Sequence, residues 1–251
     1  MLLRALHSVR DGLLGLAYPE ECRICGSAVE SWDDGVACDA CWSDASVTPL
    51  FDGDVCVKCG SPMTRVVSPS RSAFGSSRSC GLCSAFAFNA ARACGTYSGA
   101  LEANILFLKT NPHICNRLRL LIEHTFSKHR EALSSDVVVP VPLHRLREKQ
   151  RGFNQAAIVA NAISRKFNMP TDDQLILRSK PTERHRAGLD ALDRARSVEQ
   201  AFAVSVSLSG NPTVLLIDDV YTTGSTIRSA TRCLIEAGAG SVNVLTIARV
   251  V

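Results

Sequence analysis

The second half of this chain alternates short apolar runs with longer segments in which apolar residues recur every three or four positions. Val214–Ile217 is consecutively apolar, a pattern typical of a strand that is buried on both faces of a parallel sheet. Asp136–Val141 and Ser241–Ala248 predict two further strands, and Leu175–Leu177 predicts a short one. Segments with helical periodicity lie between these runs.

Amphipathic helices are predicted where the spacing changes. His113–Leu133 carries an apolar stripe with charges on its other side, and Phe153–Phe167 carries a second such stripe. Upstream of both, the residues from Phe86 predict a strand or hairpin and then a helix that begins near Ser98. Strands and helices in alternation indicate an α/β fold, with a parallel sheet flanked by helices and joined by right-handed crossovers.

The first part of the chain has a different pattern, in which four Cys-x-x-Cys pairs replace the apolar runs. Two residues between thiolates let both reach one tetrahedral ion, and two pairs complete its shell. We therefore predict two structural zinc sites in a small zinc-ribbon-like domain, with the partition of the pairs left open. The eight predicted ligands are Cys22, Cys25, Cys38, Cys41, Cys56, Cys59, Cys80 and Cys83.

Two other uses of these cysteines are weaker alternatives. A disulfide framework needs an oxidising compartment, which nothing in the sequence indicates. A thioredoxin-like redox centre needs one pair that opens a helix after a strand, whereas four pairs are present.

The composition divides the chain into two domains. With 251 residues and 46% hydrophobic content, it can bury a sizeable core. A Ser/Arg-rich stretch, 61–79, has too few apolar residues to pack and predicts a mobile insertion. We expect an N-terminal helix and zinc-binding domain over 1–85, and the α/β domain over 86–251.

Charge and hydropathy bear on the compartment. The net charge of +4 suits an anionic small ligand without requiring nucleic acid. Charged residues such as Arg4 and Arg10 interrupt the leucines of Met1–Glu20, and no later run is long enough to span a bilayer. We expect a cytoplasmic protein whose first helix packs on its own domain, with a membrane-surface helix as the alternative.

Candidate chemistry is concentrated directly after the Val214–Ile217 run. Asp218 and Asp219 follow the predicted strand, which delivers its last residues to a ligand crevice. Thr222–Thr226 then predicts a turn whose N–H groups and hydroxyls surround a phosphate, with Ser225 or Thr226 capping the next helix. Together they predict a cradle for a phosphate and a ribose. The plainer alternative is a helix-capping acid pair followed by an ordinary loop.

A second candidate segment, Val139–Gln155, follows the Asp136–Val141 strand. Its prolines and Gly152 favour a loop over a solvated helical face. Basic donors in such a loop can close over a multiply charged ligand. The donors are His144, Arg145, Arg147, Lys149 and Arg151.

These motifs resemble those of known proteins. The acid pair and T-T-G-x-T turn resemble the motif by which type I phosphoribosyltransferases hold phosphoribosyl pyrophosphate (PRPP). With VPVPLH, RGFNQ, the Cys-x-x-Cys pairs and a Tyr97-x-Gly99 helix start leading to Lys109, nearly the whole chain resembles the ComF family. The sequence departs from that family's pattern around Arg186–Val198, on the side of the acceptor.

The resemblance implies a type I phosphoribosyltransferase fold, magnesium with PRPP, and a link to DNA uptake in competence. It implies ribose contacts from the acid pair, 5′-phosphate contacts from the turn, and a mobile loop that closes over pyrophosphate. The implied PRPP-binding residues are Pro142, His144, Arg145, Asp218, Asp219, Val220, Tyr221, Thr222, Thr223, Gly224, Ser225 and Thr226. The implied catalytic residues are Asp218, Asp219, Arg147, Lys149 and Arg151.

Three functions fit this sequence. The first is a phosphoribosyltransferase that moves the phosphoribosyl group to a nitrogen acceptor and releases pyrophosphate. The second is a non-catalytic PRPP sensor whose zinc domain and basic segments handle single-stranded DNA. The third is a scaffold in which the zinc domain docks another protein.

Overall fold

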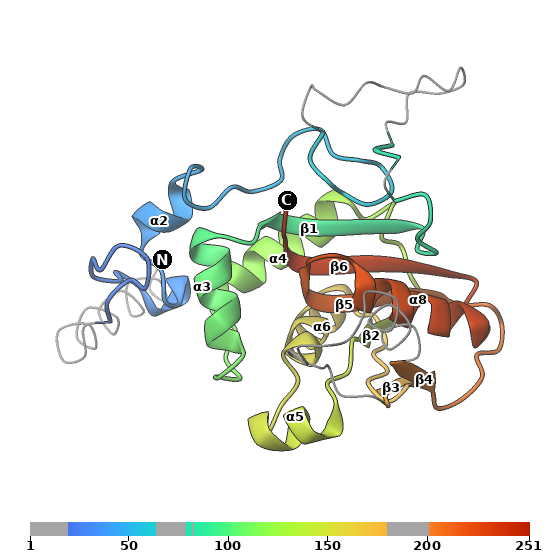
Figure 1. Ribbon diagram of the computed structural model, residues 1–251. Coiled ribbons are helices and arrows are strands. Elements are labelled where there is room, and N and C mark those ends of the chain that lie inside the picture. The colour runs from blue at the N-terminus through green and yellow to red at the C-terminus, as the bar shows by residue number, and fades with distance from the viewer. Residues whose placement is uncertain (1–19, 64–78, 82, 180–200) are drawn as a thin grey trace, which may run out of the picture.

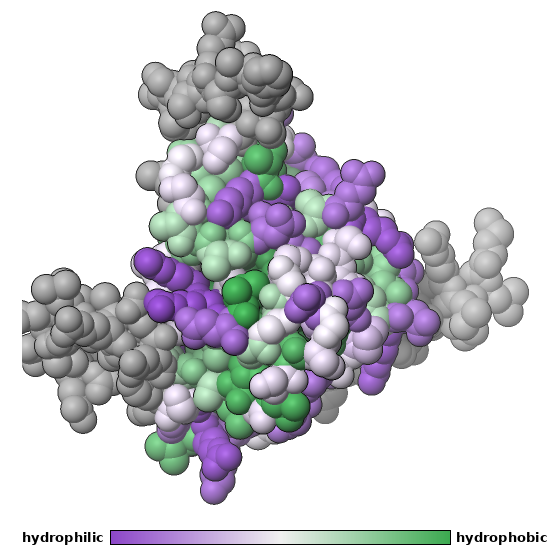
Figure 2. Space-filling view, turned by 90° about the vertical axis from the view of Figure 1, so that its right-hand side faces the viewer, coloured by the Kyte–Doolittle hydropathy of each residue, from purple (hydrophilic) through white to green (hydrophobic). Residues whose placement is uncertain are grey.

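A computed structural model of the chain describes residues 20–63, 79–81, 83–179 and 201–251 (Figure 1). The predicted N-terminal helix, most of the 61–79 insertion and the Arg186–Val198 segment lie outside the described residues. Among the residues described, no helix combines the length and apolar character needed to cross a membrane. The surface on the right-hand side of Figure 1 has hydrophobic and hydrophilic residues interspersed (Figure 2). The domain boundary near Phe86 stays a prediction.

Four parallel strands form the central sheet, in the order β1-β6-β5-β2. Strand β5 lies inside the sheet between β6 and β2, with Asp218 beside Thr246 and Ile217 beside Pro140. The predicted parallel α/β fold with a zinc-ribbon-like N-terminal part is confirmed. The strands are β1 (Ala90–Thr96), β2 (Val137–Pro140), β5 (Thr213–Tyr221) and β6 (Ser241–Arg249).

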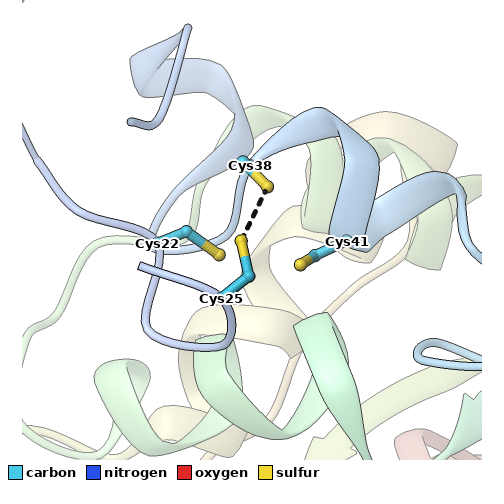
Figure 3. A group of neighbouring side chains, drawn as sticks. All are labelled: Cys22, Cys25, Cys38 and Cys41. Carbon is cyan, nitrogen blue, oxygen red and sulfur yellow. Dashed lines mark hydrogen bonds between the residues drawn. The ribbon is translucent and has the colours of Figure 1, made fainter. Parts of the chain in front are cut away.

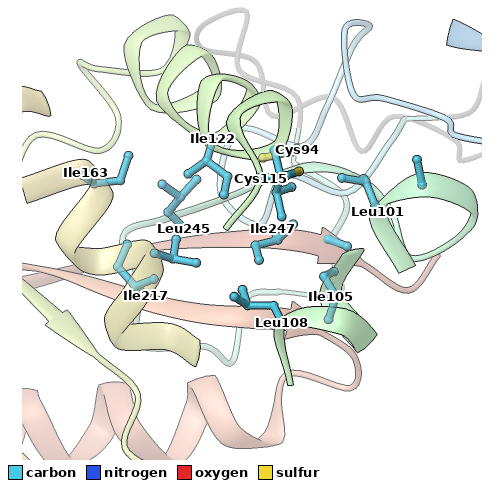
Figure 4. Close-up of a cluster of buried hydrophobic side chains, with 14 of the residues drawn as sticks. Cys94, Leu101, Ile105, Leu108, Cys115, Ile122, Ile163, Ile217, Leu245 and Ile247 are labelled. Atoms are coloured by element: carbon cyan, nitrogen blue, oxygen red, sulfur yellow. The ribbon is translucent and has the colours of Figure 1, made fainter. Parts of the chain in front are cut away.

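Helices cover both faces of this sheet because its inner strands are apolar on both sides. On one face Leu215, Ile217 and Leu245 pack against three helices (Figure 4). On the other, Leu216 and Val244 pack against α8 (Ser225–Glu236). The three helices are α3 (Gly99–Leu108), α4 (Asn116–Lys128) and α6 (Gln155–Phe167), so the predicted helices are confirmed.

Smaller elements complete the described chain. Near the N-terminus are a 3-10 helix, η1 (Trp32–Asp34), and α2 (Asp39–Ser43). Strands β3 (Ile176–Arg178) and β4 (Phe202–Val204) pair antiparallel in a separate two-stranded sheet. The predicted strand at Leu175–Leu177 is therefore present within one residue.

The predicted basic loop is wrong in part, because α5 spans Arg145–Arg151 as a helix. Its capping residues explain the difference. His144 is the N-cap and accepts a hydrogen bond from the Leu146 N–H, while Gly152 ends the helix with a φ of 80°. The prolines precede the helix, and Gly152 is a C-terminal cap, so neither opposes helix formation.

Leu245→Ala should lower the free energy of unfolding by about 2–5 kcal/mol, because it empties space in a core where Leu245 is fully buried. Urea unfolding of the zinc-loaded protein measures this. Leu146→Ala is the control, because Leu146 is 62% exposed and surface changes stay within about 0.5 kcal/mol. Equal losses in both variants would contradict the assignment of β6 to the core.

Candidate functional site

The eight paired cysteines form two clusters, and each cluster joins pairs that are neighbours in sequence. Within each cluster the four Sγ atoms lie within 4.8 Å of one another. A tetrahedral ion with Zn–S bonds of about 2.3 Å places its sulfurs about 3.8 Å apart. One Sγ–Sγ pair of the first cluster and three of the second lie 3.5 to 3.7 Å apart, which fits this edge and is too long for disulfide bonds. The first cluster is Cys22, Cys25, Cys38 and Cys41, and the second is Cys56, Cys59, Cys80 and Cys83.

The two clusters are built from the same local structure. In the first, the Cys22 N–H donates to the Ser27 carbonyl and the Gly26 N–H to the Cys22 carbonyl. The same two bonds recur in the second cluster among Cys56, Ser61 and Gly60. Both glycines have positive φ, 77° and 68°, which the tight turn under the thiolates requires. Figure 3 shows the first cluster, whose Sγ atoms converge from this turn and from Cys38 and Cys41 at α2.

The acid pair lies within the last four residues of β5 and not beyond its end, because the strand continues to Tyr221. Asp218 is 9% exposed. Its carboxylate accepts a hydrogen bond of 2.9 Å from the Asp219 N–H, and that of Asp219 accepts one of 2.8 Å from the Val220 N–H. The backbone therefore orients both carboxylates at the carboxyl end of the sheet.

Two polar side chains contact Asp219, and a third reaches it through one of them. The Lys109 Nζ, at the end of α3, lies 3.4 Å from its carboxylate. The Gln155 Nε2, at the start of α6, donates at 3.2 Å, and Gln155 in turn accepts from Arg151 of α5. The Asp219 side chain keeps 13% of its surface exposed. Its contacts are polar and exchangeable, so a ligand can replace them.

The surroundings of Asp218 disfavour a charge on its carboxyl group. Burial raises its pKa well above the ordinary value, the charge of Asp219 adds to this effect, and the charge of Arg178 opposes it. Burial also lowers the pKa of Arg178, whose guanidinium lies 5.2 Å from the centre of the Phe202 ring. The Arg178 Nε has no hydrogen-bond partner among the described residues. Burial and the charge of Asp219 thus disfavour the ionised form of Asp218, and a cation or hydroxyl donor beside it would stabilise that form.

A cationic pocket of about 420 Å³ opens beside the acid pair. Its lining residues come from the end of α3 and from α5: Lys109, Thr110, Arg147, Gln150 and Arg151. Burial lowers the pKa of Arg151, and the charge of Asp219 opposes that shift. Two of the five basic donors predicted in this segment, Arg147 and Arg151, therefore line the pocket. Lys149 does not, and it is exposed, as is Arg145.

The predicted phosphate turn lies between β5 and α8. Thr222, Thr223 and Ser225 are exposed, and Gly224 is the N-cap of α8 with a φ of 75°. The predicted cap at Ser225 or Thr226 is therefore wrong, because only a residue that adopts positive φ easily can make this turn. Gly224 has no side chain to cap the 12-residue α8, and the Ser225 N–H donates to the Thr223 hydroxyl at 3.4 Å. A helix N-terminus without a side-chain cap from its N-cap residue favours an anion.

The other predicted site residues surround this region. Tyr221 is buried and packs its ring against Phe86 and Phe88, and its carbonyl accepts a hydrogen bond of 2.9 Å from the Val250 N–H. Val220 and Pro142 are half-buried. Whether these residues bind PRPP stays a prediction.

Sequence reasoning missed three contributors to the site. Lys109 entered only through the family resemblance, and Gln155 only as the last letter of RGFNQ. Arg178 carried no signal, because its proximity to Asp218 depends on how β3 packs against the sheet.

Known families and relatives match different parts of the chain. A family model described as a double zinc ribbon domain matches residues 13–84. Competence protein F of Haemophilus influenzae is 36% identical over 45% of this chain and 50% of its own. Competence protein ComFC of Bacillus subtilis is 29% identical over 83% of both chains. DNA utilization protein YhgH of Escherichia coli K12 is 32% identical over 52% of this chain and 57% of its own. The chain thus spans about half the length of the Haemophilus and Escherichia relatives.

Solved structures overlap with about half of the chain. Glutamine PRPP amidotransferase from B. subtilis gives a TM-score of 0.37 at 19% identity, covering 53% of this chain and 28% of that one. A purine phosphoribosyltransferase from Pyrococcus horikoshii gives 0.31 at 14% identity, covering 53% and 80%. These partial overlaps carry no further argument.

Asp218→Asn should stabilise the unliganded protein. Between the ordinary Asp pKa of 3.8 and the raised pKa, the folded state binds more protons than the unfolded state. Stability therefore falls as pH rises, by at most about 1.4 kcal/mol per pH unit for one group. An amide does not ionise, so the advantage of the variant should grow from mildly acidic to mildly alkaline pH. Thermal unfolding of the zinc-loaded proteins measures it.

Asp44→Asn is the matched control with the opposite sign. Asp44 is exposed, and hydrogen bonds from Ser46 lower its pKa, so its ionised form favours the folded state at neutral pH. Its replacement should cost a little stability, with no growing advantage at alkaline pH. A pH-independent advantage of Asp218→Asn would contradict a desolvated, titrating carboxyl group.

Proposed function

The chain belongs to the ComF family, and from this premise we propose that its α/β domain binds PRPP at the acid pair, the turn and the cationic pocket. The observation that carries this proposal is the position of Asp219, which contacts Lys109 and Gln155 beside a pocket with three cationic side chains. A ligand for this site needs hydroxyl groups for the carboxylates and phosphates for the cations. PRPP carries both.

Each part of PRPP has a complementary group in this site. The ribose hydroxyls donate to Asp218 and Asp219, as hydroxyl donors would stabilise two carboxylates that lie close together. The 5′-phosphate lies in the 222–226 turn against the free N–H groups of α8. The pyrophosphate occupies the pocket, where Lys109, Arg147 and Arg151 neutralise it.

Magnesium fits the same site. The acid pair supplies carboxylate oxygens, and Mg²⁺ is held by one or two carboxylates together with substrate phosphates and water. Asp219 is the better candidate ligand because its side chain remains partly exposed, whereas Asp218 is buried. The ion would add positive charge beside the pyrophosphate and so help to neutralise it.

We further propose phosphoribosyl transfer as the reaction. A nitrogen nucleophile forms a bond to the anomeric carbon as the carbon–oxygen bond to pyrophosphate breaks. Pyrophosphate leaves with the electron pair of that bond, and the nitrogen gives up its proton to solvent water. Arg147 and Arg151 stabilise the charge that grows on the departing pyrophosphate. The acid pair fixes the ribose so that nucleophile and leaving group stay in line.

Asp219→Asn should weaken PRPP binding about tenfold or more, because it removes a charged partner of the ribose hydroxyls and the magnesium ion. Isothermal titration of the zinc-loaded protein with PRPP and Mg²⁺ measures this. The matched control is Asp52→Asn, which removes another acid in an ion pair, that with Lys128. Unchanged affinity in Asp219→Asn would contradict the proposed site, and pyrophosphate release with candidate bases would then test turnover separately.

A second proposal, handling of single-stranded DNA, is favoured by the exposure of α5. No residue of this helix is buried, and Arg145 and Lys149 are exposed on it. The names of the relatives, which refer to competence and DNA utilization, agree with such a role. On this basis we propose a role in competence or DNA use, with α5 contacting phosphates of the strand.

Lys149→Ala should weaken binding of labelled single-stranded DNA and lower the slope of log affinity against log salt by about 0.7, as expected for one lost phosphate contact. Fluorescence anisotropy across a salt series measures both. Lys166→Ala is the control, because Lys166 is exposed at the opposite end of α6 from Gln155. Equal slopes in the two variants would place DNA elsewhere on the surface.

A further inference from the structure

Arg249 connects the second cysteine cluster with the end of β5. It is the last residue of β6, and its Nη1 donates a hydrogen bond of 2.6 Å to the Cys59 carbonyl. The same guanidinium lies 4.1 Å from the centre of the Tyr221 ring, within the range of a cation–π contact. One side chain therefore contacts both a predicted zinc ligand and the last residue of β5, directly before the phosphate turn.

The Tyr221 ring in turn supports that turn. A Cβ atom on Gly224 would lie 2.8 Å from the Tyr221 Oη and 2.9 Å from the Phe86 Cε1. Gly224 thus packs directly on these two rings. Because Gly224 is the N-cap of α8, the position of the rings sets where the free N–H groups of α8 lie.

A second contact from the same cluster fixes Phe86. Lys58, which lies between Cys56 and Cys59, donates a hydrogen bond of 2.7 Å to the Phe86 carbonyl. Its own carbonyl accepts from the Ala91 N–H of β1 at 2.7 Å. The Cys56–Cys59 turn therefore holds both residues whose rings lie beneath Gly224. It holds Phe86 through Lys58, and it holds Tyr221 through Arg249, which donates to the Cys59 carbonyl.

We infer that the second zinc-ribbon site sets the conformation of the 222–226 turn, with Arg249 as the positioning residue that couples them. Zinc orders the Cys56–Cys59 turn, which holds Arg249 and Phe86, and these hold Tyr221 and Gly224. The inference rests on the proposed function only for the identity of the anion that the turn binds. Linkage is reciprocal, so an anion in the turn must raise the affinity of the second site for zinc.

The first cluster provides the comparison, because its contacts lead to a different element. The Cys41 carbonyl accepts from the Thr48 hydroxyl, whose oxygen accepts from the Ala100 N–H in the first turn of α3. Disrupting the first site should therefore loosen α3 and leave the 222–226 turn ordered.

Hydrogen exchange of the full zinc-loaded chain, without ligand, tests the inference. Arg249→Met should speed exchange of the peptide that covers 222–230 by about fivefold or more, while peptides from α4 and α6 exchange as before. Arg249→Lys, which keeps a cation and a donor, should restore part of the protection. Cys80→Ser should have the effect of Arg249→Met, and Cys25→Ser should not. Cys25 and Cys80 form a matched pair, because each is the most exposed thiol of its cluster.

Zinc transfer to a chromophoric chelator tests the reciprocal effect. At equilibrium with the chelator, PRPP with Mg²⁺ should raise the zinc affinity of one of the two sites about fivefold in the wild type and leave it unchanged in Arg249→Met. Unaltered exchange of 222–230 in Arg249→Met, or equal opening by Cys25→Ser and Cys80→Ser, would overturn the inference. If the turn opens as expected but the wild type binds no PRPP, the coupling stands and the proposed function fails.

Discussion

The complete burial of β5 is the constraint on which the rest of the structure depends. Val214–Ile217 are fully buried between two layers of helices, so the strand cannot shift without exposing apolar surface on both faces. Because the strand is fixed in this way, the two residues that follow, Asp218 and Asp219, can be acidic without displacing it. Asp218 raises the free energy of the folded state, as its elevated pKa indicates, and the packing of four apolar residues before it offsets this cost.

Periodicity predicted the elements that lie against this strand, because their apolar positions follow directly from burial. The stripe in α4 and the runs in β2 and β6 are examples. Prediction was wrong where capping decided the outcome. Gly152 and Gly224 both adopt positive φ, but one ends α5 and the other begins α8, and residue identity alone does not distinguish these roles.

The candidate site was predictable as far as it is local in sequence. The acid pair, the turn and the thiolate pairs each occupy a few adjacent positions, so residue type and spacing were enough to predict what each could bind. Lys109, Gln155 and Arg178 reach the acids from three separate elements, and their contacts exist only after the chain has folded. The partition of the thiolates is of the same kind, because the spacing allowed two arrangements and packing selected neighbouring pairs.

The two zinc-ribbon clusters support the two sides of the candidate site separately. The first cluster reaches the start of α3 through Thr48, and the end of α3 carries Lys109 to Asp219. The second reaches the phosphate turn through Arg249 and Tyr221. Lys109 and the turn would contact opposite ends of the proposed ligand, so their separation must match its length. Metal-fixed turns suit this task because bound zinc stabilises a short segment that has too little apolar surface to order itself. If the proposed function holds, the zinc domain is part of the ligand site, since it sets the distance between the groups proposed to hold pyrophosphate and those proposed to hold the 5′-phosphate.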